Sequence, residues 1–364
     1  MKNPTPYQAT HPGEVLKDEL KARDIRQKDF ALDIDMQPTM LNEVIKGKRS
    51  VTADIALLLE EALDIPADFW LRFQNQYEID QARIRDRNTK KLQRIQLWKN
   101  IKEFVPVRFF ARAGVLTGNL EEDLNTVFHI YGVTVLSELE DRVTNQMASL
   151  PAHYRKSDKL QVDKINLLGW TKLVAWKAET AKAASFNPDS FRDLKSELFP
   201  VIYSNSNTRD RVRDVLATYG IKMIFQQKFE KTPVDGYAFW SGNNPAIALT
   251  LRHKRIDNFA FTLFHELGHV YLHLSKNREI SFLDLESKSN AKASDPETEA
   301  NDFAKDALIP EELWAELLQE KTLSDESIRG FAAKHQTHPA IVLGRLLYEQ
   351  NFYAVKSTID RRLS

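Results

Sequence analysis

Two histidines four residues apart in an apolar run constrain this chain more than any other feature. The stretch from Phe259 to His273 reads FAFTLFHELGHVYLH, and His265 and His269 are its first two histidines. On a helix, side chains four apart lie on one face, one turn apart, so two imidazoles can bind one cation. Glu266 then lies to one side, where it can take a proton from a water without being a ligand. The alternative is an accidental pair of core histidines.

A third ligand is expected from the acidic stretch DPETEANDFAKDAL at residues 295–308. His273 lies roughly 12 Å along a continuous helix from the first histidine, and zinc needs each nitrogen within about 2.1 Å. In the acidic stretch, Glu297 falls about 50° from the centre of the apolar helix face, and Glu299 about 110°. We therefore expect Glu297 to be the ligand, with Asn301 orienting it. The alternative is that both glutamates only favour the positive helix N-terminus.

The expected ligand set predicts a catalytic Zn²⁺ site. Three protein ligands leave one tetrahedral position open, which distinguishes a catalytic zinc from a structural one. Zinc lowers the pKa of its water and polarises a carbonyl group, and Glu266 passes the proton to the leaving amine, so hydrolysis of a peptide bond is the expected reaction. An extended substrate can pair with a nearby β-segment. Four side chains are candidates for the oxyanion donor, and each is equally suited to an ordinary surface or core position: Tyr237, His273, His335 and His338.

The pattern along the chain predicts a mostly α fold with a small β-sheet, of the α+β class. Residues 10–80 read as short helices, with segments near 27–33, 38–45, 53–63 and 67–76, and two of these flank a three-residue turn, as in a helix-turn-helix. Residues 216–251 contain short β-type runs separated by Gly, Pro and Asn. We expect three parts: a five-helix helix-turn-helix domain at 1–82, a basic linker and helical middle segment at 83–215, and a zincin-like HExxH metallopeptidase domain at 216–364.

Composition narrows the functional classes. The 364 residues contain no Cys, which excludes thiol catalysis and cysteine zinc sites and suits a reducing cytoplasm. Neither a signal-peptide run nor a stretch of ~20 apolar residues is present, so membrane insertion is not expected. The net charge of zero is the sum of −5 over residues 1–80, +6 over residues 81–100 and −1 over the rest. The basic block is either a solvated linker or a segment that faces DNA phosphates.

Two known families share these motifs. Residues 10–82 resemble the HigA-type antitoxins of the Xre/Cro helix-turn-helix group, through HPGEVLKDEL, GKRSVT and PADFWLRFQNQYEID. Residues 216–350 resemble the ImmA/IrrE metallopeptidases, through RHKRIDNFAFTLFHELGHVYLH and ETEANDFAKDALIP. The middle segment, including residues 154–157 and 170–176, is similar to what lies between these modules in fused members, and we attach no function to it.

The resemblances imply a role in transcription. Peptidases of the second family bind zinc and often cut a DNA-bound repressor, and their inward glutamate maps onto Glu297. Modules of the first family bind operator DNA as homodimers, repress their own operon and neutralise a toxin ribonuclease. The leading hypothesis is a cytoplasmic DNA-binding regulator with a zinc-dependent endopeptidase domain that cleaves a repressor, antitoxin or related protein. The alternative is a non-proteolytic HigA-like antitoxin or autorepressor whose zinc domain binds a toxin or senses a ligand. A third possibility is a peptidase whose first module only dimerises.

The helix-turn-helix segment departs from its family in ways that weaken phosphate attraction. Asp35 stands where the turn usually has Gly, and Glu43 stands where a basic residue is common. Affinity for DNA is therefore expected to depend on a few side chains. The candidates for base contacts are Gln37, Thr39 and Asn42, and those for phosphate contacts are Lys46, Lys48 and Arg49. The alternative is a helical module that is used for protein contact.

Overall fold

The computed structural model describes residues 6–149, 163–285, 295–320, 323–349 and 357–364. The chain divides into two compact units, residues 1–99 and 100–364, and each is described by itself. Residues 154–157, which belong to the expected middle segment, lie outside the described residues. Within the described residues, no helix has the length and apolar character needed to cross a membrane.

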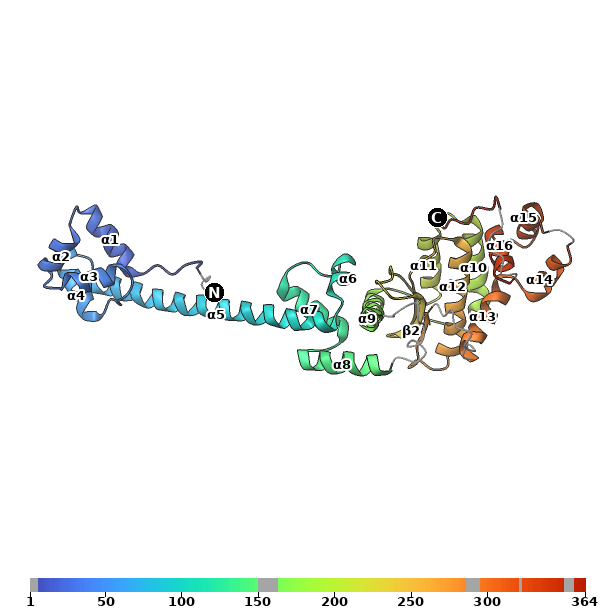
Figure 1. The fold of residues 1–364 in the computed structure, drawn as a ribbon, viewed down its shortest axis with the longest axis horizontal. Helices are drawn as coiled ribbons and strands as arrows, with labels where there is room; N and C mark the ends of the chain where they lie inside the picture. Colours follow the sequence, from blue (N-terminus) through green and yellow to red (C-terminus); the bar gives the residue numbers. More distant parts are fainter. Residues whose placement is uncertain (1–5, 150–162, 286–294, 321–322, 350–356) are drawn as a thin grey trace. The chain divides into compact units, whose positions relative to one another are not determined.

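The first unit is a bundle of helices around one small core (Figure 1). Its helices are α1 (Pro12–Ala22), α2 (Gln27–Asp33), α3 (Pro38–Ile45), α4 (Ala53–Leu63) and α5 (Ala67–Phe104). Leu16, Leu41, Leu59 and Trp70 are fully buried in the core. Asp35 lies in the turn between α2 and α3 with φ at 48°, so an aspartate occupies the left-handed region that favours glycine.

Helix α5 is much longer than the sequence pattern predicted, and the expected end near residue 76 is wrong. The helix continues to Phe104 because no Gly or Pro occurs between residues 67 and 104, and Pro106 is the first to follow. Side chains four apart add weak support, as in the ion pair between Lys90 and Asp86 at 2.8 Å. The basic block of residues 81–100 therefore lies on a helix.

The second unit combines a four-stranded sheet with helices. Its first helices are α6 (Val107–Arg112), α7 (Leu120–Tyr131), α8 (Leu136–Ser149), α9 (Lys164–Thr180), α10 (Phe191–Ser204) and α11 (Thr208–Thr218). The strands are β1 (Lys222–Phe225), β2 (Val234–Ser241), β3 (Asn244–Leu249) and β4 (Phe282–Leu285), in the order β1-β3-β2-β4. The remaining helices are α12 (Ile256–Gly268), α13 (Asp295–Leu308), α14 (Glu311–Leu318), α15 (Asp325–Lys334) and α16 (Pro339–Glu349).

Strand pairing shows one element that the sequence did not predict. β1 pairs with β3 in parallel, whereas β2 pairs antiparallel with both β3 and β4. Strand β4 lies outside residues 216–251, the range in which the sequence pattern predicted β-type runs. The strand is short and has Asp284 between two leucines, so it carries no recognisable β-type run.

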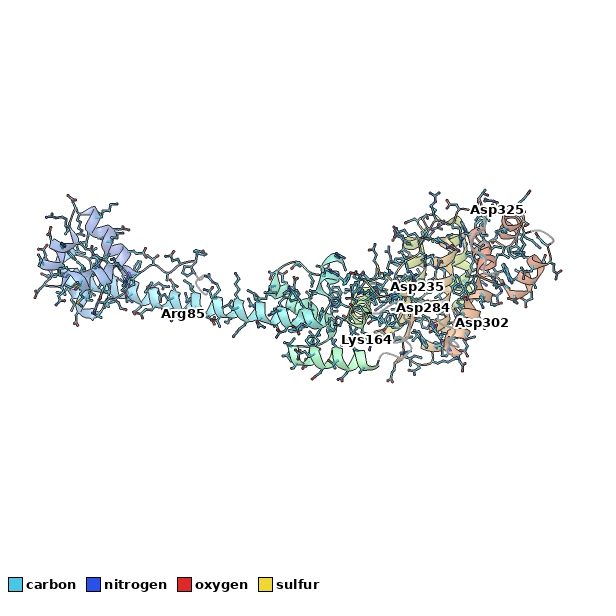
Figure 2. All side chains as sticks on the ribbon, viewed as in Figure 1. Arg85, Lys164, Asp235, Asp284, Asp302 and Asp325 are labelled. Carbon is cyan, nitrogen blue, oxygen red and sulfur yellow. The ribbon has the colours of Figure 1, made fainter. Side chains whose placement is uncertain are left out.

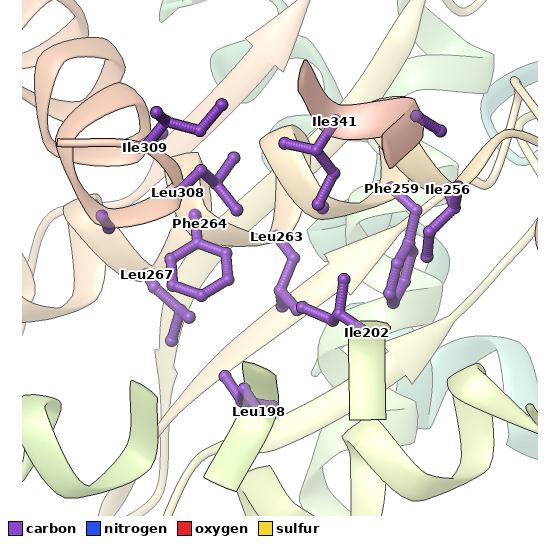
Figure 3. Close-up of a cluster of buried hydrophobic side chains, with 14 of the residues drawn as sticks. Leu198, Ile202, Ile256, Phe259, Leu263, Phe264, Leu267, Leu308, Ile309 and Ile341 are labelled. Atoms are coloured by element: carbon purple, nitrogen blue, oxygen red, sulfur yellow. The ribbon is translucent and has the colours of Figure 1, made fainter. Parts of the chain in front are cut away.

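The core of the second unit lies around α12. Figure 3 shows side chains of α10, α12, α13 and α16 packed together, among them Leu198, Leu263, Phe264 and Leu308. Apolar residues of α10 and α11 belong to the same core as the sheet. The core therefore begins before residue 216, where the metallopeptidase domain was expected to start. It fixes the position of α12 against α13, which together carry the expected metal ligands.

Candidate metal centre

Helix α12 and the turn that follows it bring two imidazoles to one point. The Nε2 atoms of His265 on α12 and of His269 just after it lie 3.1 Å apart, and the two residues are 3% and 0% exposed. The helix forms here because apolar side chains surround the histidines on both sides in sequence and are buried in the core. Two buried ring nitrogens that face each other need a shared partner, since an unpartnered polar atom in a core is costly.

Glu297, in the first turn of α13, faces the two histidines. Its Oε2 lies 3.3 Å from His265 Nε2, and its Oε1 lies 3.6 Å from His269 Nε2. Ligands held tetrahedrally at 2.0–2.1 Å from zinc are separated by about 3.4 Å. The separations of 3.1, 3.3 and 3.6 Å match that edge length. The three side chains therefore fit a tetrahedral cation with the fourth position left for another ligand.

The far ring nitrogens of both histidines have partners of their own. His265 Nδ1 lies 3.1 Å from Asn301 Oδ1, and an amide oxygen only accepts, so Nδ1 carries the proton and Nε2 has a free lone pair. Asn301 thus contacts a histidine and not Glu297, whose orientation the sequence had assigned to it. The contact fixes the ring orientation and tautomer that metal binding needs.

The third histidine of the motif extends the contacts outward from the ligands. His273 Nδ1 lies 3.2 Å from His269 Nδ1, and His273 Nε2 donates to Glu299 Oε2 at 2.8 Å. With the proton of His273 on Nε2, its Nδ1 accepts from His269 Nδ1–H, which leaves His269 Nε2 free for a cation. The helix widens to a π-helical turn over His269–Leu274, immediately after α12. Such turns are rare and often occur at functional sites.

Glu266 is fully buried, and its carboxylate has no hydrogen-bond donor among the described residues. Burial, followed by the negative charges of Asp284 and Glu297, raises its pKa well above the usual value for glutamate. The backbone of Gly236 on β2 lies directly against the carboxylate, where any larger residue would collide with it. An orphaned carboxylate beside two histidines has the surroundings of a general base rather than of a structural residue.

Asp284 on β4 is a member of the site that the sequence analysis missed. Its carboxylate, His265 and Glu266 offer ligand atoms that all lie within 4.8 Å of one another. Burial, only partly offset by His265, raises the pKa of Asp284 to about 6. Phe282, two residues earlier on the same strand, stacks on His269 with ring centroids 4.1 Å apart. Because Phe282 and Asp284 are two residues apart, both lie on the same face of β4, and this face lies over the candidate metal centre.

The pKa values of the three expected ligands are shifted in different directions. Burial would raise the pKa of Glu297, but its close contacts with His265 and His269 outweigh burial and lower that pKa to about 2. Burial lowers the pKa of His269. For His265, burial also acts to lower the pKa, but the carboxylate of Glu297 outweighs it and the pKa is raised. Metal binding requires a charged carboxylate and two neutral imidazoles, so a cation would displace the proton that the raised pKa favours on His265.

The remaining oxyanion candidates have local contacts. The Tyr237 ring stacks on Phe239 at 4.6 Å, and burial raises the pKa of its hydroxyl. His335 packs against Phe331, with ring centroids 4.6 Å apart. His338 Nδ1 accepts a hydrogen bond from the N–H of Ala340 at the start of α16. The contacts of these three side chains and of His273 assign none of them to an oxyanion.

The expected DNA-contacting residues lie on and after α3 in the first unit. Gln37, Thr39, Lys46, Lys48 and Arg49 are exposed, and Asn42 is half-buried. Arg49 Nε donates to Glu43 Oε2 at 2.9 Å, so an acid of α3 already holds one of the expected phosphate contacts. Gln37 is the N-cap residue of α3, and its side chain makes no capping hydrogen bond to the helix.

Fold and site together define a class: a helix-turn-helix DNA-binding regulator that carries a metallopeptidase-type domain. Family models support both parts, as residues 16–70 match the model described as "Helix-turn-helix", and residues 218–346 match the "IrrE N-terminal-like domain" of the M78 peptidases. The chain belongs to the Xre-type helix-turn-helix family and bears an M78, IrrE/ImmA-like domain.

Curated relatives match the first unit. "Virulence-associated protein I" of Dichelobacter nodosus is 35% identical over 82 residues, which are 22% of this chain and 74% of that protein. The "Uncharacterized HTH-type transcriptional regulator YddM" of Escherichia coli is 22% identical over 71 residues, 20% of this chain and 76% of that protein. These similarities describe the first fifth of the chain only.

Solved structures of HigA-type antitoxins also align with this chain. The structure titled "Pseudomonas aeruginosa antitoxin HigA with higBA promoter" is 30% identical, with 23% of this chain and 91% of that chain covered and a TM-score of 0.21. A putative antidote protein of a plasmid maintenance system from Nostoc punctiforme is 34% identical, with 24% and 93% covered and a TM-score of 0.22.

Proposed function

We propose that the protein is a transcriptional regulator whose M78 domain is a Zn²⁺-dependent endopeptidase, with a repressor, antitoxin or related regulatory protein as its substrate. One observation carries the proposal. His265, His269 and Glu297 converge at tetrahedral spacing, and the orphaned carboxylate of Glu266 lies beside them.

The chain's own side chains can perform the proton transfers of peptide hydrolysis. Zinc bound by the three ligands would lower the pKa of a water molecule and polarise the carbonyl group of the substrate. Glu266, whose buried carboxylate has a raised pKa, takes the proton from the attacking water and donates it to the leaving amine. Asn301 holds the ring of His265 in the orientation that ligation needs.

Strand β4 offers a place for an extended substrate. It is the last strand of the sheet and pairs with β2 on one side, and no other strand in the described part of the chain pairs with its second edge. An edge strand presents unpaired N–H and C=O groups to which a peptide can add as a further strand. A peptide held there would lie next to Asp284 and thus beside the centre.

The first unit is proposed to bind operator DNA as a homodimer in the cytoplasm. Thr39 and Asn42 on α3, with Gln37 just before it, would contact the bases, because α3 is the second helix of the helix-turn-helix. Lys46 and Lys48 follow as phosphate contacts. The absence of Cys supports a reducing compartment.

A comparison of Glu266→Gln with the wild type tests the peptidase. Both proteins are purified, their zinc content is measured, and each is co-expressed with the products of neighbouring genes. We expect one zinc per chain in both and cleavage of a partner, or of the protein itself, by the wild type alone, detected as new termini by mass spectrometry. Absence of cleavage by the wild type would contradict the proposal.

The same experiment separates the alternative function. A non-proteolytic HigA-like antitoxin or autorepressor would regulate equally well with Glu266→Gln. Operator binding would then weaken only with variants of the first unit, such as Asn42→Ala and Arg49→Ala. A stand-alone peptidase would cleave its partner but would not bind DNA even at low salt.

A further inference from the structure

A cavity of about 380 Å³ opens next to the metal centre. Phe261 and Thr262 of α12 line it on one side, Asn301 of α13 on another, and Asp284 of β4 at the sheet. Asn301 also contacts His265, so the cavity adjoins the ligands. A volume above about 300 Å³ is within the range of small-molecule sites and is large enough for an amino-acid side chain.

Most charged groups in the cavity wall are already paired. Arg255 donates to Asp257, and Arg345 Nε donates to Glu349 at 2.8 Å. Asp235 has an ion pair as well, with Arg252 at 3.8 Å. These contacts leave Asp284 as the lining carboxylate whose charge the described residues do not pair with Lys or Arg.

Asp284 therefore differs from the other acidic residues of the cavity wall, which are paired with arginines. Asp284 is half-buried where it lines the cavity, and none of the described residues donates a hydrogen bond to its carboxylate. Besides the imidazole of His265, the titratable groups that face this carboxylate are acidic, namely Asp235, Glu266 and Glu297. Figure 2 labels Asp235 and Asp284, which belong to neighbouring strands of the sheet. A half-buried carboxylate among other carboxylates is stabilised by a cation that comes close to it, and Asp284 faces the cavity as well as the metal centre.

We propose that Asp284 binds a cationic nitrogen of the substrate, next to the bond that the centre cleaves. The inference rests on the proposed peptidase function and names a substrate class for it. Two groups of a peptide supply such a nitrogen: the side chain of Lys or Arg, which fits cleavage of an internal bond, and the α-ammonium of a free N-terminus, which would instead make the enzyme an aminopeptidase. The closeness of Asp284 to His265 and Glu266 puts that nitrogen within one residue of the reacting carbonyl.

Three zinc-binding probes test whether a positive charge is preferred, and whether the preferred charge is an α-ammonium or a side-chain ammonium. N-acetyl-norleucine hydroxamate has no cation, norleucine hydroxamate has an α-ammonium, and Nα-acetyl-lysine hydroxamate has a side-chain ammonium. Their dissociation constants are measured by calorimetry on the zinc-loaded full-length protein. We expect at least one cationic probe to bind roughly tenfold or more tightly than the neutral probe, as for a buried charge-assisted hydrogen bond.

Variants assign that preference to one carboxylate. Asp284→Asn should bring the cationic and neutral probes to within about threefold of each other, whereas Asp284→Glu should keep most of the difference. Glu279→Gln removes an exposed acid shortly before β4 and should leave the preference unchanged. Zinc content and circular dichroism of each variant show that it is folded and loaded.

Each outcome decides the inference. Equal affinities of the three probes for the wild type, or an unchanged preference in Asp284→Asn, would overturn it even if the protein cleaves a partner. A cation preference that disappears in Asp284→Asn would support the proposed role of Asp284 even if no cleavage were found. The absence of cleavage would then contradict the proposed peptidase function but not the role of Asp284. Failure of the zinc-loaded protein to bind any probe would overturn both.

Discussion

Gly236 of β2 lies directly against the carboxylate of Glu266, so that a Cβ at position 236 would be 2.0 Å from Glu266 Oε1. A separation below 3.0 Å requires atoms to move. Glu266 is fully buried and packed on all sides, so its carboxylate has little room to retreat. The glycine thus leaves the space in which the proposed general base is held.

Substitution of this glycine should separate catalysis from metal binding. Gly236→Ala is expected to displace the carboxylate of Glu266 and to lower peptidase activity by about 10²–10⁴-fold, the usual contribution of a positioned acid or base. The zinc content should stay at one per chain, because the three proposed ligands lie on α12, on the π-helical turn that follows it and on α13, and none lies on β2.

The control for this substitution is Gly330→Ala on α15, where an added Cβ meets nothing within 4 Å. It should keep full activity and raise the free energy of unfolding by roughly 0.5–1 kcal/mol. Full activity in Gly236→Ala, measured on the same substrate, would contradict the role of the glycine.

The contacts of His273 and Glu299 predict a contribution to zinc affinity. They orient His269 and favour the tautomer that leaves Nε2 free, so His273→Gln and Glu299→Gln should each weaken zinc binding by about 10–100-fold. Competition with a chelator measures this without a substrate. Asp302→Asn is the matched control, since this acid of α13 is exposed and pairs with Lys305. Unchanged zinc affinity in both His273→Gln and Glu299→Gln would rule out this contribution.

The sequence allowed the ligand-bearing elements to be predicted because helix periodicity is local. The four-residue spacing put the two histidines on one face, and the helical wheel turned Glu297 inward; both follow from 3.6 residues per turn. Asp284 could not be found in this way. It reaches the centre only because β4 pairs with β2, and the register of Gly236 opposite Asp284 depends on contacts far apart in sequence.

The same distinction explains the errors in the fold. Helix α5 continues past the expected end near residue 76 because no helix-breaking residue stops it before Phe104. The function of Glu299 was missed because its contact with His273 depends on the π-helical turn, which shifts side chains away from regular helix positions. Sequence periodicity assumes regular geometry.

The cap of α1 predicts that acid weakens the first unit. His11 Nδ1 accepts a hydrogen bond from the N–H of Gly13 at 2.9 Å, which it can do only when unprotonated. Burial lowers the pKa of His11 below the unfolded value of 6.5, with Glu14 acting in the opposite direction. A histidine with a lowered folded-state pKa contributes full stability above pH 6.5 and loses it as pH falls below that value.

The measurement compares wild type with His11→Asn, which keeps a pH-independent acceptor at the cap. Thermal unfolding of the full chain is followed at pH 7.5 and 5.5. Other titrating groups contribute equally to both proteins, so the difference between the two shifts in Tm isolates His11. We expect the wild type to lose more stability at pH 5.5 than the variant, and identical shifts would contradict the role of the cap.

The ion pair between Glu43 and Arg49 predicts a variant that binds DNA more tightly. Glu43 lies on α3 and holds the Arg49 guanidinium at 2.9 Å, with both side chains 46% exposed. Glu43→Gln releases the guanidinium and removes a negative charge from the helix proposed to enter the groove. We expect affinity for DNA upstream of the gene to rise several-fold, and the slope of log K against log salt to steepen by about 0.9, one phosphate contact. Fluorescence anisotropy between 50 and 200 mM salt measures both quantities. Asp68→Asn is the control, since it breaks a more exposed pair with Arg72 on α5 and makes the same change in net charge. If the two variants gained equally, the effect would come from net charge alone, and Arg49 would not be a phosphate contact.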